Sequence, residues 1–143
     1  MKKKIASLLC VLLVIFGMPA TVCASEVTPR ASEYFSYTSV HACAIGNGKV
    51  CIEIDINATH MMDEVGASVV HIYEKQTNGS YKEVYKYTKA AYPNLIVEDS
   101  FFGYVDVTYQ GTSGKEYYAI VGCYAKDSTG SETLYFYTNV ITA

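Results

Sequence analysis

Several features that would identify a function are missing from this sequence. It has no tryptophan and only 3 prolines among 143 residues. Its longest apolar run, Ile5 to Gly17, is well short of the roughly 20 residues that a membrane-spanning helix needs. There is no Gly-x-Ser-x-Gly elbow and no glycine-rich phosphate loop. The sequence therefore contains no motif of a familiar hydrolase or nucleotide-binding enzyme.

Basic charge is also scarce once the first residues are set aside. Without Lys2, Lys3 and Lys4, the 11 basic residues fall to eight against 14 acidic ones, a net charge of −6. The remaining basic residues are scattered singly, whereas nucleic-acid and anionic-membrane binders need a basic patch. We therefore expect that the protein binds neither nucleic acid nor an anionic membrane.

The first 24 residues have the three parts of a secretory signal peptide. Three lysines precede the apolar run, and Val22-Cys23-Ala24 provides a small-residue cleavage site. We expect cleavage after Ala24, a secreted protein without a membrane anchor, a loose leader over residues 25–34 and one domain over residues 35–143.

Period-two alternation dominates this domain, and turn signals recur about every ten residues. The pattern predicts seven short antiparallel strands packed as a β-sandwich. The expected strands are 35–45, 49–59, 67–75, 81–88, 102–109, 116–126 and 133–142, with 60–66 as a connection. The expected core comprises Val50, Ile52, Ile54, Ile56, Val70, Ile72, Val121 and Phe136.

Two resemblances support this interpretation. Residues 117–125, the Asp127–Gly130 turn and residues 137–142 are similar to the last two strands of a fibronectin type III-like or immunoglobulin-like domain. Residues 25–143 also resemble short, exported, uncharacterised proteins of Gram-positive gut bacteria, which share Met62–Ser68 and a strand ending in Glu74-Lys75. The second resemblance implies a fold and a compartment, and no activity.

The cysteines allow one disulfide within the domain. If Gly46 to Gly48 forms the first hairpin loop, Ile45 opposes Lys49 and Cys43 opposes Cys51, at a separation that suits a disulfide. The alternatives are two unpaired thiols or a Cys51–Cys123 bridge. Against that bridge, Cys51 shares its face with Glu53, whereas Cys123 has inward parity.

We expect no metal, no cofactor and no catalytic site. His41, His60 and His71 have no zinc-ligand spacing, and His41 is too far along its strand from Cys43 to activate the thiol. Calcium at Asp63-Glu64 or Glu98-Asp99 would need further oxygen ligands, so solvated turns are the simpler interpretation.

The most unusual feature is the 14 tyrosines. Several have outward parity on strands expected to be neighbours, and His71 lies near them: Tyr73, Tyr118, Tyr124, Tyr135 and Tyr137. Such a face suits stacking on sugars or anchoring a protein. The predicted function is a non-catalytic binding or adhesion module for a protein or glycan. The alternatives are a purely structural or decoy-like secreted domain and, third, a small extracellular enzyme.

Overall fold

The computed structural model describes residues 32–143. The predicted signal peptide, residues 1–24, and most of the predicted leader, residues 25–34, lie outside the described residues. Among residues 32–143, no helix is long and apolar enough to cross a membrane.

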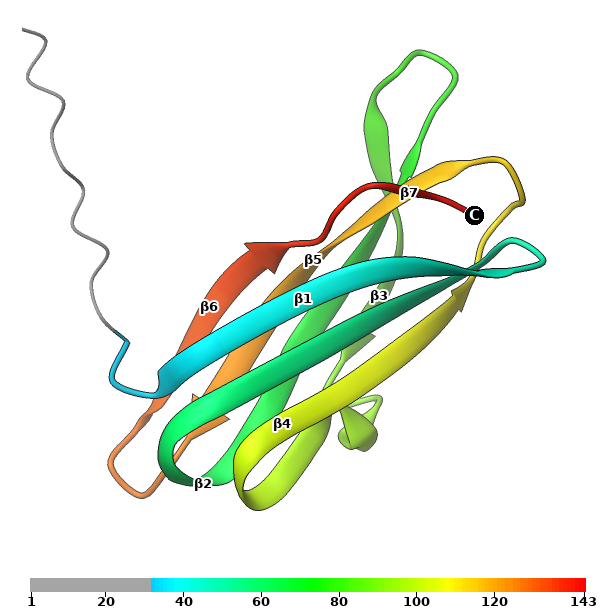
Figure 1. Cartoon of the computed structure of the whole chain (residues 1–143). Helices are drawn as coiled ribbons and strands as arrows, with labels where there is room; N and C mark the ends of the chain where they lie inside the picture. Colours follow the sequence, from blue (N-terminus) through cyan, green and yellow to red (C-terminus); the bar gives the residue numbers. More distant parts are fainter. Residues whose placement is uncertain (1–31) are drawn as a thin grey trace, which may run out of the picture. The chain divides into compact units, whose positions relative to one another are not determined.

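Residues 32–143 form an all-β unit with seven antiparallel strands (Figure 1). A single 3-10 turn, Pro93–Leu95, precedes the fourth strand. The strands are β1 (Phe35–Gly46), β2 (Lys49–Lys75), β3 (Tyr81–Thr88), β4 (Ile96–Gln110), β5 (Glu116–Lys126), β6 (Ser131–Tyr137) and β7 (Ile141–Thr142).

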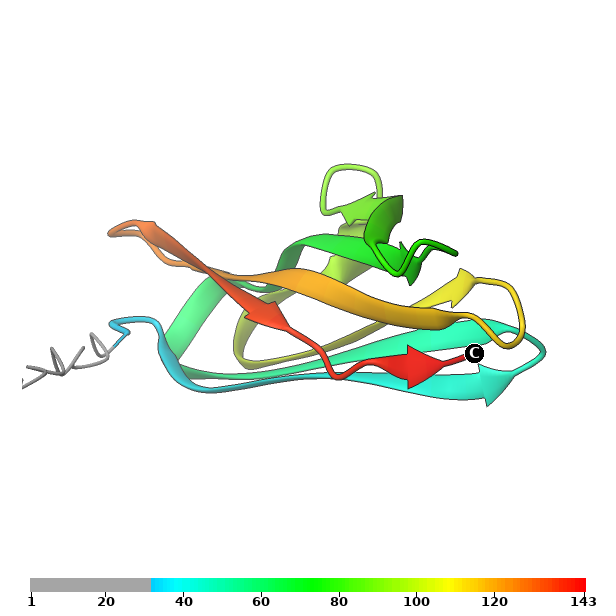
Figure 2. The same cartoon turned by 90° about the horizontal axis from the view of Figure 1, so that it is seen from above.

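All seven strands belong to one hydrogen-bonded sheet, which curls into a half-barrel. The first half of β2 lies between β1 and β4, and its second half lies between β3 and β5. β6 and β7 pair with β5. Seen from above, the two halves of the sheet face each other (Figure 2). The all-β, antiparallel prediction is confirmed, whereas a sandwich of two separate sheets is not.

The sheet stays continuous because β2 does not end where the sequence pattern suggested. The expected connection over residues 60–66 is wrong: this segment is strand, and it links the two halves. Its backbone remains paired with β4 at Met62 and Glu64, after an irregularity that follows Asn57. Glu64 also pairs with Lys126 of β5, so partners on both sides hold this stretch extended.

At Gly66, β2 passes close to Leu95, the last residue before β4. Its φ of +154° is one that side chains rarely allow, and a Cβ there would overlap the carbonyl oxygen of Leu95. Only glycine therefore lets the chain bend so closely against its neighbour.

The last predicted strand, residues 133–142, is divided in two. Thr138 bonds the backbone of Ala119 through both its N–H and its hydroxyl. The Asn139 side chain then accepts from the N–H of Ala42 and donates to its C=O, both at 2.9 Å. In the segment between β6 and β7, these bonds take the place of regular ladder pairing with β5.

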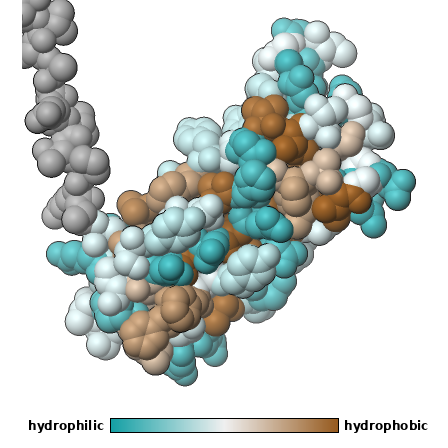
Figure 3. Space-filling view, in the orientation of Figure 1, coloured by the Kyte–Doolittle hydropathy of each residue, from teal (hydrophilic) through white to brown (hydrophobic). Residues whose placement is uncertain are grey.

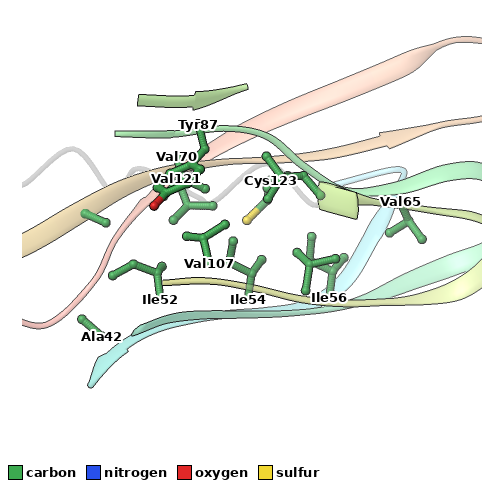
Figure 4. Packing of buried hydrophobic residues seen from close by; sticks show 14 of the residues in the cluster. Ala42, Ile52, Ile54, Ile56, Val65, Val70, Tyr87, Val107, Val121 and Cys123 are labelled. Atoms are coloured by element: carbon green, nitrogen blue, oxygen red, sulfur yellow. The ribbon is translucent and has the colours of Figure 1, made fainter. Parts of the chain in front are cut away.

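The core lies between the facing halves of the sheet (Figure 4). Ile52, Ile54 and Ile56 from one half point toward Val70 and Val121 from the other. Seven of the eight predicted core residues are fully buried, and Phe136 is partly buried against them. The core also contains Tyr117, the largest fully buried side chain, which is not among the eight predicted core residues.

Candidate functional site

The predicted outward tyrosines do share one face of the sheet. On β5, Tyr117, Ala119 and Val121 point into the core, so Tyr118 and Tyr124 point outward. Tyr73 on β2 pairs with Tyr118. On β6, Tyr135 pairs with Gly122 and Tyr137 with Ile120. We call this surface the tyrosine face, and it comprises Tyr73, Tyr81, Tyr118, Tyr124, Tyr135 and Tyr137 with His71.

Four of these rings are in contact with one another. Tyr73 and Tyr118 are stacked, with centroids 5.0 Å apart and planes inclined by 6°. Tyr81 meets Tyr118 edge-on at 4.9 Å, and Tyr137 stacks beside Tyr118 at 6.3 Å. Tyr118 is therefore the centre of a continuous aromatic surface that spans four strands.

Tyr81 was missing from the predicted set. It opposes Lys75 at the start of β3, across the Asn78-Gly79 turn. A register shift between Ile72 and Tyr73 separates the pairing near this turn from the rest of the hairpin. The alternation of polar and apolar residues along β3 does not by itself reveal this shift, and so it does not place Tyr81 on the tyrosine face.

Tyr135 and Tyr137 are the most accessible rings of the face, at 60% and 68% exposure. Tyr135 lies over Gly122, where an added Cβ would come within 3.2 Å of the Tyr135 ring. The missing side chain at position 122 lets the ring lie against the strand. One side of this ring is thus supported while the other faces solvent.

Tyr124 lies apart from this group of rings. Within the described part of the chain it makes no ring contact, and the ammonium of Lys89 lies 3.9 Å from its centroid. Lys89 also bonds Glu64 at 2.7 Å, and this bond holds the pKa of Glu64 below its ordinary value. Beside this pair is a shallow hollow of about 280 Å³, lined in part by Pro93 and Glu98. The structure therefore brings five of the six predicted residues together and leaves Tyr124 at the edge.

Polar groups border the stacked rings. His71 Nδ1 lies 2.9 Å from a carboxylate oxygen of Glu83, next to Tyr73. Burial, and secondarily the Glu83 charge, raise the pKa of Tyr73. On the other side, Lys75 pairs with Glu116 at 2.7 Å, which lowers the pKa of Glu116. Hydrogen-bonding groups thus surround a largely aromatic centre.

The opposite face combines charged and aromatic side chains. Glu53 and Asp55 point outward there. However, Tyr37, Phe102 and Tyr104 are also exposed on it, at 52%, 63% and 62%. In Figure 3, which shows this side, hydrophobic residues lie near the bend of β2 and β4 and also at the other end of the sheet. The opposite face therefore presents aromatic as well as charged surface.

The structure confirms that Cys43 lies opposite Cys51 on the neighbouring strand. The turn between the two strands differs from the prediction. Gly46, not Ile45, opposes Lys49, and an irregularity between Ala44 and Gly46 restores the expected register. Both cysteines are free thiols, and Cys123 is free and fully buried. Burial, and then the neighbouring Cys43, raise the pKa of Cys51 to about 11. The disulfide itself stays a prediction.

The sequence and the structure were compared with known proteins. No family model, no curated protein and no solved structure matches the chain.

Proposed function

We propose that this chain is a secreted, non-catalytic binding module that holds a protein or glycan partner on its tyrosine face. The observation that supports the proposal best is the contact of Tyr73, Tyr81 and Tyr137 with the central Tyr118. These contacts form one aromatic surface, bordered by groups that can form hydrogen bonds.

The chemistry of tyrosine fits such a role. Tyrosine offers a large contact area with a polar tip, and it is enriched in the centres of protein interfaces. Rings already held by their neighbours lose little side-chain freedom on binding, so little entropy opposes association. Tyr135 and Tyr137 keep most of their surface in solvent and supply the accessible contact area.

A purely structural domain is the competing proposal. Cross-strand pairs such as Tyr73 with Tyr118 stabilise a solvent-facing sheet without any ligand. The large exposed fractions of Tyr135 and Tyr137 favour the binding proposal, because rings that only stabilise a sheet gain most when they are covered.

The proposed relation to fibronectin type III-like and immunoglobulin-like domains rests on strand neighbours. β1, the first half of β2 and β4 are adjacent, as are the second half of β2, β5 and β6. In immunoglobulin domains, strands A, B and E share one sheet and strands C, F and G share the other. The proposal is that β2 corresponds to B and C joined into one strand. The proposals of export and of kinship with exported Gram-positive proteins rest on the sequence alone.

A binding screen with matched variants tests the proposed function. The full chain is applied to an array of defined mucin, plant and bacterial cell-wall oligosaccharides, and to a displayed library of linear peptides. We compare the wild type with a Tyr135→Ser/Tyr137→Ser variant and with a Tyr37→Ser/Tyr104→Ser control on the opposite face. The proposal predicts signals that only the first variant loses. The proposal would be contradicted if the wild type bound neither the oligosaccharide array nor the peptide library. Equal loss of signal in both variants would also contradict it.

A further inference from the structure

A second cluster of reactive side chains lies on the opposite side of the sheet from the tyrosine face. In the hairpin of β1 and β2, Cys43 opposes Cys51, and two residues away His41 opposes Glu53. Residues two apart on a strand point to the same side, so all four belong to the outer surface of this hairpin. The sheet thus arranges two thiols, one carboxylate and one imidazole in two adjacent rows.

Three of these residues are already close enough to share one ion. The two sulfur atoms and a carboxylate oxygen of Glu53 all lie within 4.8 Å of one another. Tetrahedral zinc bound at the usual zinc–sulfur and zinc–oxygen distances holds its ligand atoms about 3.4 to 3.8 Å apart. Side-chain rotations therefore suffice to close the cluster around an ion.

We propose that Cys43, Cys51 and Glu53 bind a zinc-class divalent cation, with the exposed His41 as the fourth ligand. Thiolates select zinc and similar cations over calcium and magnesium, which prefer oxygen ligands alone. Binding exchanges the cation's water for protein ligands, and each thiol that binds releases its proton to solvent. No electron transfer is involved.

The charges around the cluster favour a cation. Asp106 of β4 opposes Glu53, and Asp55 lies two residues further along β2. Within residues 32–143, none of these three carboxylates takes part in an ion pair. A bound divalent cation would relieve the repulsion between them.

Sequence spacing could not reveal this arrangement. The pairs His41-x-Cys43 and Cys51-x-Glu53 are too short for a zinc motif when each is taken alone. Cys43, Cys51 and Glu53 come together, with His41 in the row beside them, only because the irregularity near Gly46 keeps Cys43 opposite Cys51. The inference is independent of the proposed function, since it concerns the other face.

Cobalt(II) provides a direct probe, because thiolate ligands give it a sulfur-to-metal charge-transfer absorption. The full chain carrying Cys10→Ser and Cys23→Ser is reduced, desalted without oxygen and titrated with Co²⁺, and then with Zn²⁺. We expect one Co²⁺ per chain, an absorption that zinc abolishes, and no competition from Ca²⁺ or Mg²⁺. The absence of this absorption in fully reduced protein would overturn the proposal.

Variants in the same background assign the ligands. Cys43→Ser and Cys51→Ser should abolish the charge-transfer band, whereas Glu53→Gln and His41→Ala should each weaken binding at least about tenfold. Cys123→Ser and Asp55→Asn serve as controls and should bind as before. Circular dichroism confirms that each variant is folded. Unchanged binding in the two cysteine variants, or loss only in Cys123→Ser, would overturn the site; unchanged binding in His41→Ala would overturn the fourth ligand.

Discussion

Tyr73 and Tyr118 lie opposite each other on β2 and β5, with ring planes only 6° apart and centroids at 5.0 Å. This stack joins the two central strands of the tyrosine face. Because Tyr118 also contacts Tyr81 and Tyr137, the pair links β3 to β6 through aromatic contacts alone.

The stack should contribute measurably to stability. We expect a double-mutant cycle with Tyr73→Ser and Tyr118→Ser to give a coupling free energy of about 0.5 to 1.5 kcal/mol in urea unfolding. Tyr73 and Tyr135, whose rings do not contact each other within the described chain, form the control cycle and should couple by less than about 0.5 kcal/mol. Equal coupling free energies in both cycles would show that the direct contact between the two rings adds no stability.

Gly66 should be the least replaceable glycine. Gly66→Ala places a Cβ against the carbonyl oxygen of Leu95 at a positive φ, so we expect the free energy of unfolding to fall by at least about 2 kcal/mol. Gly79→Ala, also at positive φ but with open space around it, should cost only about 1 kcal/mol. If urea unfolding gives the same loss for both, the close approach of β2 and β4 is not a constraint on stability.

The sequence predicts much of the tyrosine face because β5 alternates regularly. With Ala119 and Val121 directed inward, Tyr118 and Tyr124 must point outward, and β2 and β6 follow by the same parity. The exposed Phe102 and Tyr104 could have been found in the same way. They alternate with Val105 and Val107, which are buried.

Other features depend on contacts that sequence periodicity does not encode. The segment 60–66 lacks a strand pattern and contains Gly66, yet pairing with β4 and β5 keeps it extended. The division of the last strand depends on Asn139, whose bonding partner Ala42 lies 97 residues away. The predicted core residues are buried between the two halves of the sheet, but the sequence pattern predicted two separate sheets and not one continuous sheet.

Acid should weaken the turn between β5 and β6. Hydrogen bonds from Thr129, His60 and Gly130 hold the pKa of Asp127 below its ordinary value. A lowered folded-state pKa means that the stabilisation is complete above the unfolded value of about 3.9 and is lost as the pH falls below it. In urea unfolding between about pH 6 and about pH 3, Asp127→Asn should lose less stability with falling pH than the wild type does. Identical slopes would contradict this role.

Oxidation should reveal the hairpin register. With oxidised glutathione as the oxidant, the reduced Cys10→Ser/Cys23→Ser chain should form a Cys43–Cys51 link, while Cys123 stays reduced because it is fully buried. Non-reducing peptide mapping identifies the linked peptides. The link uses the thiols of the proposed metal site, so bound zinc should slow its formation. A Cys51–Cys123 peptide would contradict the observed parity.

The affinity of a ligand found in the binding screen tests the central claim most directly. Its dissociation constant is measured by calorimetry for the wild type and for single Tyr135→Ser and Tyr137→Ser variants. We predict a loss of more than 1 kcal/mol for each, about fivefold or more in the constant, since truncated interface anchors cost this much. The Tyr37→Ser/Tyr104→Ser control should bind as the wild type does. If instead the control loses affinity and the two single variants retain it, the partner binds the opposite face and the account is wrong.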